Sequence, residues 1–71
     1  MIRELDVVIL KRDIEEHSLR KGMHGTVVHC YDAPGVYEVE FFDESGRTIT
    51  VATTYESDIE LSMPRPDPVR P

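Results

Sequence analysis

Alternation of apolar and polar residues along the chain predicts a series of short β-strands. The first candidate is Leu5–Leu10, and because charged side chains avoid a protein core we expect the face that holds Asp6 to be the outer one. Thr26–Tyr31 and Val36–Asp43 are predicted as the second and third strands, and Ile59–Leu61 as the last. The pattern therefore favours an all-β fold.

The segment Lys11–Lys21 interrupts the alternation with mixed charges. It can form one helical turn at Asp13–Glu16 or a long excursion between strands, and we favour the excursion because so short a helix is unstable alone. Gly22 and Gly25 follow, and glycine lets a chain turn sharply and approach a neighbouring strand closely. We interpret the two glycines as the entry to a small β-barrel.

A turn between the second and third strands is predicted at Pro34 and Gly35, since proline presets φ and glycine supplies the positive φ of a type II turn. If this turn has two residues, Val28 and Cys30 point inward, and Cys30 serves as a small apolar core residue. A slip of one residue would reverse the faces of the second strand.

The same register predicts an outer surface patch. Val27 then lies opposite Phe42 and His29 opposite Glu40, with Glu38 on the same face. An apolar pair ringed by charged side chains is typical of a protein-binding surface, whereas strong barrel curvature would instead fold Phe42 into the core. The candidate partner-binding residues are Val27, His29, Glu38, Glu40 and Phe42.

The next hairpin can be predicted from the requirement that both of its strands bury their apolar residues. This requirement is met only if the loop has an odd number of residues. The three residues Glu44–Gly46 fit, with the glycine in the left-handed conformation. Asp43 then faces Arg47, and Ile49 and Val51 point inward.

The remaining elements complete a recognisable series. Thr53–Asp58 is predicted as a short turn or a single turn of 3₁₀ helix before the fifth strand, and prolines crowd the end of the chain. Five short strands, one long excursion and two tight hairpins indicate a five-stranded SH3-like barrel. We expect one domain over residues 1–63 and a disordered, proline-rich C-terminal tail over residues 64–71.

Size and charge narrow the function. The chain has 71 residues and a formal net charge of −6, and residues 1–63, which hold six basic and thirteen acidic side chains, carry −7. A domain this small has a thin core and no cleft between domains. A phosphate backbone is repelled by this charge, so nucleic acid is an unfavourable partner, whereas a basic protein is attracted.

The chemistry-bearing residues form no catalytic pattern. Cys30 is the single cysteine, so neither an intramolecular disulfide nor a thiolate cluster is expected, and a reducing cytoplasm fits best. No signal peptide or membrane span is predicted. The spacing of His17, His24 and His29 matches no metal site, and the pair of glycines lacks the residues of a phosphate loop. We expect no catalytic residue, no metal and no cofactor.

Three segments carry a resemblance to a known family: Met1–Val8, Leu19–His29 and Tyr37–Phe41. Over Met1–Leu61 the chain resembles the small bacterial "domain of unknown function" family numbered 4926, which implies an SH3-like fold and no assigned activity. Members that lie beside toxin-like genes imply an antitoxin or immunity role. Gly-Thr-Val-Val followed by Tyr-x-Val-x-Phe is also similar to the SH3-like barrel of the nitrile hydratase β subunit, which transfers no catalytic residue.

The leading hypothesis is therefore a non-enzymatic protein-interaction module of the cytoplasm, which docks an acidic face on a protein partner encoded by an adjacent gene. One alternative is an accessory subunit or domain of an enzyme, by analogy with nitrile hydratase. A further alternative is an RNA-binding SH3-like barrel. The sequence leaves open whether the protein is a monomer or a homodimer.

Overall fold

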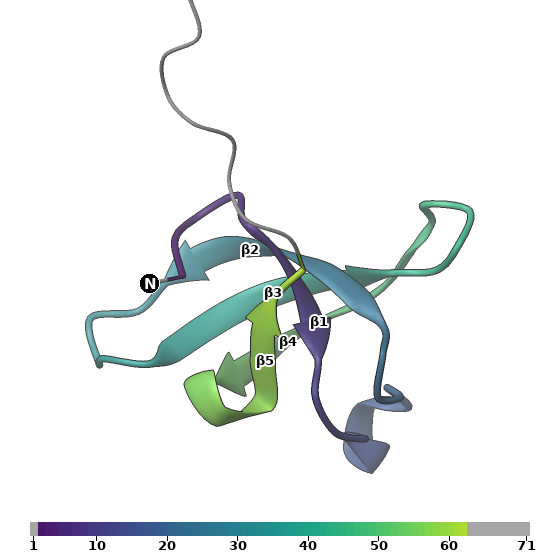
Figure 1. Cartoon of the computed structure of the whole chain (residues 1–71), viewed down its shortest axis with the longest axis horizontal. Helices are drawn as coiled ribbons and strands as arrows, with labels where there is room; N and C mark the ends of the chain where they lie inside the picture. The colour runs from purple at the N-terminus through teal and green to yellow at the C-terminus, as the bar shows by residue number, and fades with distance from the viewer. Residues whose placement is uncertain (1, 63–71) are drawn as a thin grey trace, which may run out of the picture.

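The computed structural model describes residues 2–62, which form five antiparallel strands in one sheet (Figure 1). Two single turns of 3₁₀ helix, η1 and η2, lie at Glu15–His17 and Glu56–Asp58. The all-β fold and the number of strands are confirmed, whereas the predicted tail lies outside the described residues. The strands are β1 (Val7–Leu10), β2 (His24–Cys30), β3 (Val36–Phe42), β4 (Thr48–Tyr55) and β5 (Ile59–Leu61).

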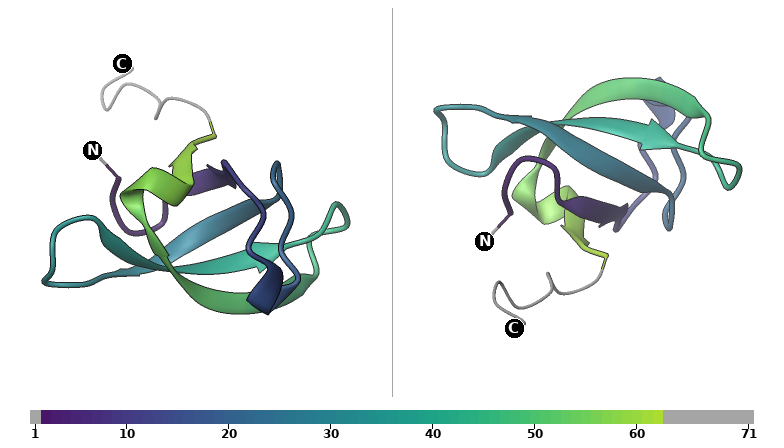
Figure 2. Two further views of the ribbon diagram at one scale, coloured as in Figure 1. Left: turned by 90° about the horizontal axis from the view of Figure 1, so that it is seen from below. Right: turned by 90° about the horizontal axis from the view of Figure 1, so that it is seen from above.

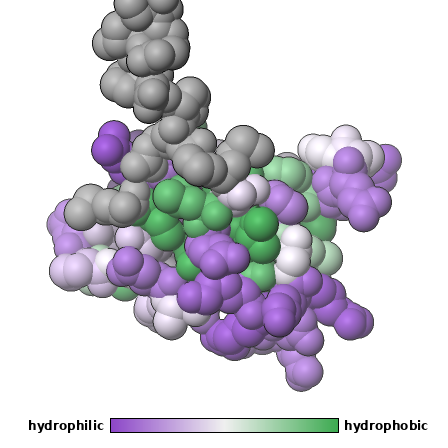
Figure 3. Space-filling model, in the orientation of Figure 1, coloured by the Kyte–Doolittle hydropathy of each residue, from purple (hydrophilic) through white to green (hydrophobic). Residues whose placement is uncertain are grey.

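The strand order is β4-β3-β2-β1-β5, and the sheet bends into two layers. Figure 2 shows β1 and β5 crossing one side of a curved layer formed by β2, β3 and β4. Figure 3 shows apolar surface around β1 and hydrophilic residues over the 11–21 excursion and the β3–β4 loop. Closure of the sheet into a barrel stays a prediction. The core consists of Ile2, Val8, Leu10, Ile14, Leu19, Val27, Tyr37, Val39, Phe41, Ala52 and Ile59.

At Gly25, strand β2 pairs with one strand of each layer. Gly25 pairs with Val8 of β1 on one side and with Phe41 of β3 on the other. A Cβ atom at Gly25 would lie 2.5 Å from Val39 Cγ1, 2.9 Å from Phe41 Cδ1 and 3.0 Å from the Glu40 carbonyl oxygen. The close approach expected of this glycine is thus confirmed, and any larger residue at this position would force Val39 and Phe41 to shift.

The excursion between β1 and β2 is also confirmed, and the alternative of one helical turn is partly right as well, because the excursion contains the single 3₁₀ turn η1 at Glu15–His17. Ile14 and Leu19 pair across it in an isolated bridge, and both side chains are buried in the core. The excursion ends at Gly22, whose φ is +94° and whose N–H donates to the Leu10 carbonyl at 2.8 Å. Two apolar anchors and one left-handed glycine therefore fix this segment without regular structure.

The face of the first strand was predicted wrongly. Asp6 is buried and points to the core side together with Val8, whereas Leu5 is 78% exposed at a φ of +73°. The reason is a local turn in which the Asp6 carboxylate accepts the Arg3 N–H at 2.8 Å, while the Asp6 N–H donates to the Arg3 carbonyl. A carboxylate with local donors can be buried where an unpaired one cannot.

The register of the β2–β3 hairpin also differs from the prediction. Gly35 has the expected positive φ of +78°, but the loop has four residues, because the Tyr31 N–H donates to the Val36 carbonyl. A bulge then places Val28 as an extra residue on β2. Val27 is therefore buried opposite Val39, and Val28 is exposed. Cys30 packs against the core as predicted, although opposite Tyr37.

The β3–β4 hairpin begins as predicted and then changes face. The three-residue loop is confirmed by the hydrogen bond from the Asp43 N–H to the Arg47 carbonyl and by the φ of +86° at Gly46. A bulge at Ile49 then shifts the pairing by one residue. Ile49 and Val51, which were predicted inward, are 39% and 46% exposed, and the small residues of β4 point to the core instead.

A buried carboxylate ties the excursion to the turn before β5. Asp58 in η2 is 3% exposed and accepts the Arg12 Nε–H at 2.6 Å and the Tyr55 N–H at 3.0 Å. Its carbonyl accepts the Lys11 N–H at 2.7 Å. The predicted turn over Thr53–Asp58 is confirmed only at Glu56–Asp58, because Thr53–Tyr55 belong to β4. The fifth strand is confirmed, and Asp58 fixes the position of η2 against the end of β1.

Gly25→Val should unfold the domain, because the added side chain would overlap Val39 and Phe41. Overpacking of this kind destabilises a core by about 3 kcal/mol or more, a large part of a small domain's stability. Urea denaturation followed by circular dichroism measures the effect, with Val28→Ala on the same strand as a control that should change little. An unchanged midpoint for Gly25→Val would contradict the assigned contacts.

Asp43 should titrate below its ordinary pKa of 3.8. Its Oδ1 accepts the Ser45 hydroxyl, the Arg47 N–H and the Ser45 N–H, and the hydroxyl contributes most to the lowered pKa. Because the folded pKa lies below the unfolded one, the carboxylate stabilises the hairpin above pH 3.8, and this stability is lost as the pH falls through the folded pKa.

Carboxyl NMR titration tests this prediction. Ser45→Ala should raise the pKa of Asp43 toward 3.8, whereas Ser57→Ala, a matched exposed substitution outside the hairpin, should leave it unchanged. Equal pKa values for Asp43 in the three proteins would show that the hydroxyl does not hold the carboxylate.

Candidate functional site

The side of the β2–β3–β4 layer that faces away from β1 and β5 is here called the outer face. Along β3 it alternates regularly with the core, since Tyr37, Val39 and Phe41 are buried and the residues between them are half-buried. This strand places two carboxylates at the centre of the face. Its outer residues are Val36, Glu38, Glu40 and Phe42.

Two rows of paired residues cross the centre of the outer face, and each contains one carboxylate. Glu38 lies between one residue of β2 and one of β4, and so does Glu40. Neither row contains a basic lysine or arginine. The rows are His29, Glu38 and Thr53, and Thr26, Glu40 and Val51.

Uncharged donors hold both carboxylates in place. Glu38 Oε1 accepts the hydroxyls of Tyr31 and Thr53, each at 2.8 Å, and Glu40 Oε2 accepts the Thr48 hydroxyl at 2.6 Å. Among residues 2–62 neither glutamate forms an ion pair with lysine or arginine. These hydrogen bonds involve one oxygen of each carboxylate, so among residues 2–62 the other oxygen can accept a hydrogen bond from a cation.

Tyr31 acts as a donor on this face. Its hydrogen bond to Glu38 is the main cause of a raised pKa, and burial and the negative charge of Glu38 raise it further. A phenol of ordinary pKa 10.0 is already protonated at neutral pH, and the raised pKa extends the pH range over which Tyr31 donates this hydrogen bond. Tyr31 therefore orients Glu38.

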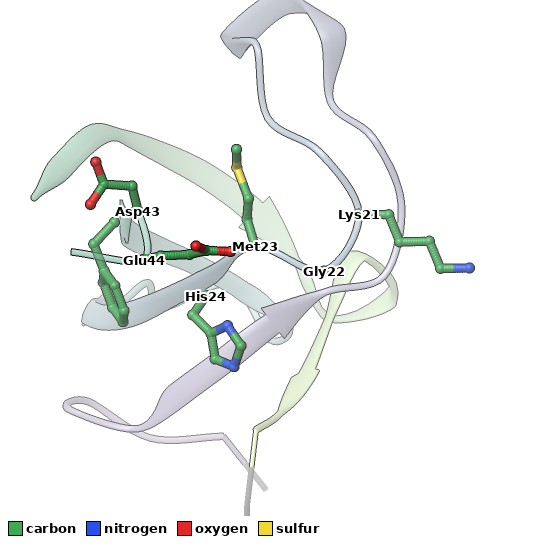
Figure 4. Close-up of a pocket in the computed structure, with 7 residues that line it drawn as sticks. Lys21, Gly22, Met23, His24, Asp43 and Glu44 are labelled. Carbon is green, nitrogen blue, oxygen red and sulfur yellow. The ribbon is translucent and has the colours of Figure 1, made fainter. Parts of the chain in front are cut away.

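Ring contacts and hollows lie at the two ends of the outer face. At one end His29 meets Tyr31 edge-on, with centroids 4.8 Å apart, beside a hollow that Ala33 and Val36 help to line. At the other end His24 and Phe42 lie 6.4 Å apart. The hollow next to them is shown in Figure 4 and is lined by Lys21, Gly22, Met23, His24, Phe42, Asp43 and Glu44.

The side chains around the second hollow do not form a compact acid–base group. Figure 4 shows Lys21 pointing away from Asp43 and Glu44, while His24 lies on another side. Within the described part of the chain, no group of three or more histidine, cysteine or acidic residues has the arrangement of a metal site. The hollow therefore presents separate polar and apolar side chains.

Four of the five predicted partner-binding residues lie on the outer face, whereas Val27 does not. Val27 is fully buried, because the bulge at Val28 turns it toward the core. His29 is opposite Glu38 rather than Glu40, and its Nδ1 lies 3.8 Å from a carboxylate oxygen of Glu4.

Sequence reasoning missed several residues of the face. Tyr31, Val51 and Thr53 belong to it, and each was assigned to another place or left out. Val51 and Thr53 depend on the bulge at Ile49, for which the sequence carries no glycine or other marker. Tyr31 could have been found, since an aromatic residue at a strand end on the face of His29 reaches the neighbouring strand.

No significant match was found among curated proteins or among solved structures. The structure contains, within residues 2–62, no helix long and apolar enough to cross a membrane. Residues 4–61, which include all five strands, match a family of uncharacterised domains. The chain therefore belongs to the family described as "Domain of unknown function (DUF4926)".

Proposed function

We propose that this chain is a small non-enzymatic protein-interaction module, and that its outer face docks on a positively charged surface of a partner protein. The observation that carries the proposal is the pair Glu38 and Glu40. Both are half-buried, both are held by neutral hydroxyl donors, and neither has a cationic partner among the described residues.

The geometry supports binding in two ways. A carboxylate that is already oriented loses little conformational freedom when a lysine or arginine binds it, so most of the charge-assisted hydrogen bond contributes to affinity. Phe42 and Val51 lie beside the two glutamates and supply apolar contact area. This combination of a partly apolar centre and oriented charges is usual for transient protein interfaces.

The overall charge favours a basic partner. Acidic side chains outnumber basic ones among the described residues and also in the whole chain, whose net charge is −6. Such a field speeds association with a basic protein and repels nucleic acid. We propose that the partner is a cytoplasmic protein encoded by an adjacent gene, and this protein is the one to test first. An antitoxin or immunity role is part of the same proposal.

The test compares two double variants that remove the same charge at different places. Glu38→Gln/Glu40→Gln should weaken binding of the co-purified basic partner by about tenfold or more, which is ~1.4 kcal/mol, because charge-assisted contacts are lost. Glu15→Gln/Glu16→Gln removes two exposed charges in η1, away from the outer face, and should have only a small effect. Isothermal titration calorimetry at low and physiological salt gives both affinities.

Three outcomes would contradict the proposal. Equal weakening in both variants would show that overall charge, and not the outer face, drives binding. The absence of any captured partner at physiological salt would argue against an interaction module. Salt-dependent micromolar binding of RNA that the Glu38→Gln/Glu40→Gln variant leaves unchanged would favour the RNA-binding alternative.

A further inference from the structure

Strand β4 is an edge of the sheet that lacks the usual protective residues. It lies at one end of the strand order and has eight residues, Thr48–Tyr55, without a charged residue, glycine or proline. Proteins normally protect an edge strand by shortness, charge, proline or a covering segment. The opposite edge follows this rule, since β5 has three residues and one of them is Glu60. The difference marks β4 as an edge that can accept another strand.

The backbone of β4 supports this reading. The Glu56 N–H donates to the Gly35 carbonyl of the neighbouring hairpin, at 2.8 Å. Because polar backbone groups alternate in direction along an antiparallel strand, Thr54 and Ala52 also direct theirs toward β3. Thr53 and Val51 direct theirs away from β3. The Tyr55 N–H also points away from β3, but it already donates to the Asp58 carboxylate at 3.0 Å.

The side chains of these same residues are suited to cover an added strand. Val51 and Tyr55 are 46% and 55% exposed, and Thr53 is exposed as well. β-branched and aromatic residues on one face of a strand pack well against a cross-strand neighbour.

Charge indicates what kind of strand fits. Val51 is opposite Glu40 and Thr53 is opposite Glu38. A strand added to β4 would add one residue to each of these two rows. The backbone of that strand would lie two strand spacings, about 10 Å, from the backbone of β3. Lysine and arginine side chains are long enough to cross an uncharged neighbour and meet a glutamate from this distance. Cationic residues two positions apart therefore match the face.

We propose that the β4 edge binds an extended segment of the partner as a sixth strand, and that this segment carries lysine or arginine at alternate positions facing Glu38 and Glu40. The inference rests on the proposed function and adds to it the way in which the partner binds. Backbone hydrogen bonds to Val51 and Thr53 supply affinity, and the two carboxylates supply the selection for cations.

A second copy of the chain is a poorer occupant. Paired with itself, β4 would place further uncharged residues beside Glu38 and Glu40, because Thr48–Tyr55 contains no cation. It would also bring together two chains that each carry a net charge of −6. The carboxylates of the face would stay without a cation.

Three synthetic peptides test the proposal on the full chain. Each has eight residues with lysine at every second position and valine or threonine between. The first is unmodified, the second is N-methylated at the lysines, and the third is N-methylated at the intervening residues. N-methylation removes the N–H groups that point to one side of a strand and keeps the charge.

Strand addition predicts that the unmodified peptide and one N-methylated peptide bind with similar affinity, while the other loses about tenfold or more. The peptide that fails also gives the orientation. Loss with methylated lysines indicates an antiparallel strand and loss with methylated intervening residues a parallel one, because residues opposite Val51 and Thr53 direct their N–H groups toward β4 only in the antiparallel case.

Binding of the three peptides to the unchanged chain and to the Glu38→Gln/Glu40→Gln variant separates this inference from the proposed function. If both N-methylated peptides bind as well as the unmodified one, and Glu38→Gln/Glu40→Gln abolishes binding, the face binds cations without strand addition and the inference is overturned. If only one methylated peptide fails but Glu38→Gln/Glu40→Gln has no effect, the edge binds strands while the proposed role of the carboxylates is wrong. Failure of the unmodified peptide to bind, or a stable dimer in light scattering that the peptide does not dissociate, overturns the inference.

Discussion

The contact between Gly25 and β3 is the constraint on which the rest of this fold depends. At this residue β2 pairs with β1 and β3 at once, and the absence of a side chain lets Val39 and Phe41 fill the space above it. Each of these buried side chains contributes about 1.5–3 kcal/mol. With only one thin core available, a domain of this size cannot lose that packing and keep its layers together.

The contact also organises the outer face. Because Val39 and Phe41 are held against Gly25, the residues between and beside them on β3 must point the other way. Glu38 and Glu40 are thus placed by the core beneath them, and the hydroxyls of neighbouring strands only refine their orientation. The packing of the core thus also sets the backbone position of the candidate site.

Local turn chemistry was readable from the sequence, whereas the faces of three strands were not. The loop at Glu44–Gly46 and the positive φ of Gly35 followed from residue type, since each needs a conformation that few residues adopt. The bulges at Val28 and Ile49 have no such marker, and each inverts every side chain beyond it. Val27 was lost from the candidate site by this effect, while the residues on β3 were predicted correctly because that strand alternates without interruption.

The bulge at Ile49 has a consequence for the folding of the chain. Without it, the β3–β4 hairpin would bury Ile49 and Val51, which is the arrangement that hydrophobicity alone favours. The native hairpin instead buries Ala52 and Thr54, whose hydroxyl donates to the Tyr37 carbonyl at 3.4 Å. The same eight residues thus encode two registers. Folding must therefore select this register over one that would hide the exposed valine and isoleucine, so burial of apolar residues on β4 cannot by itself specify the native hairpin.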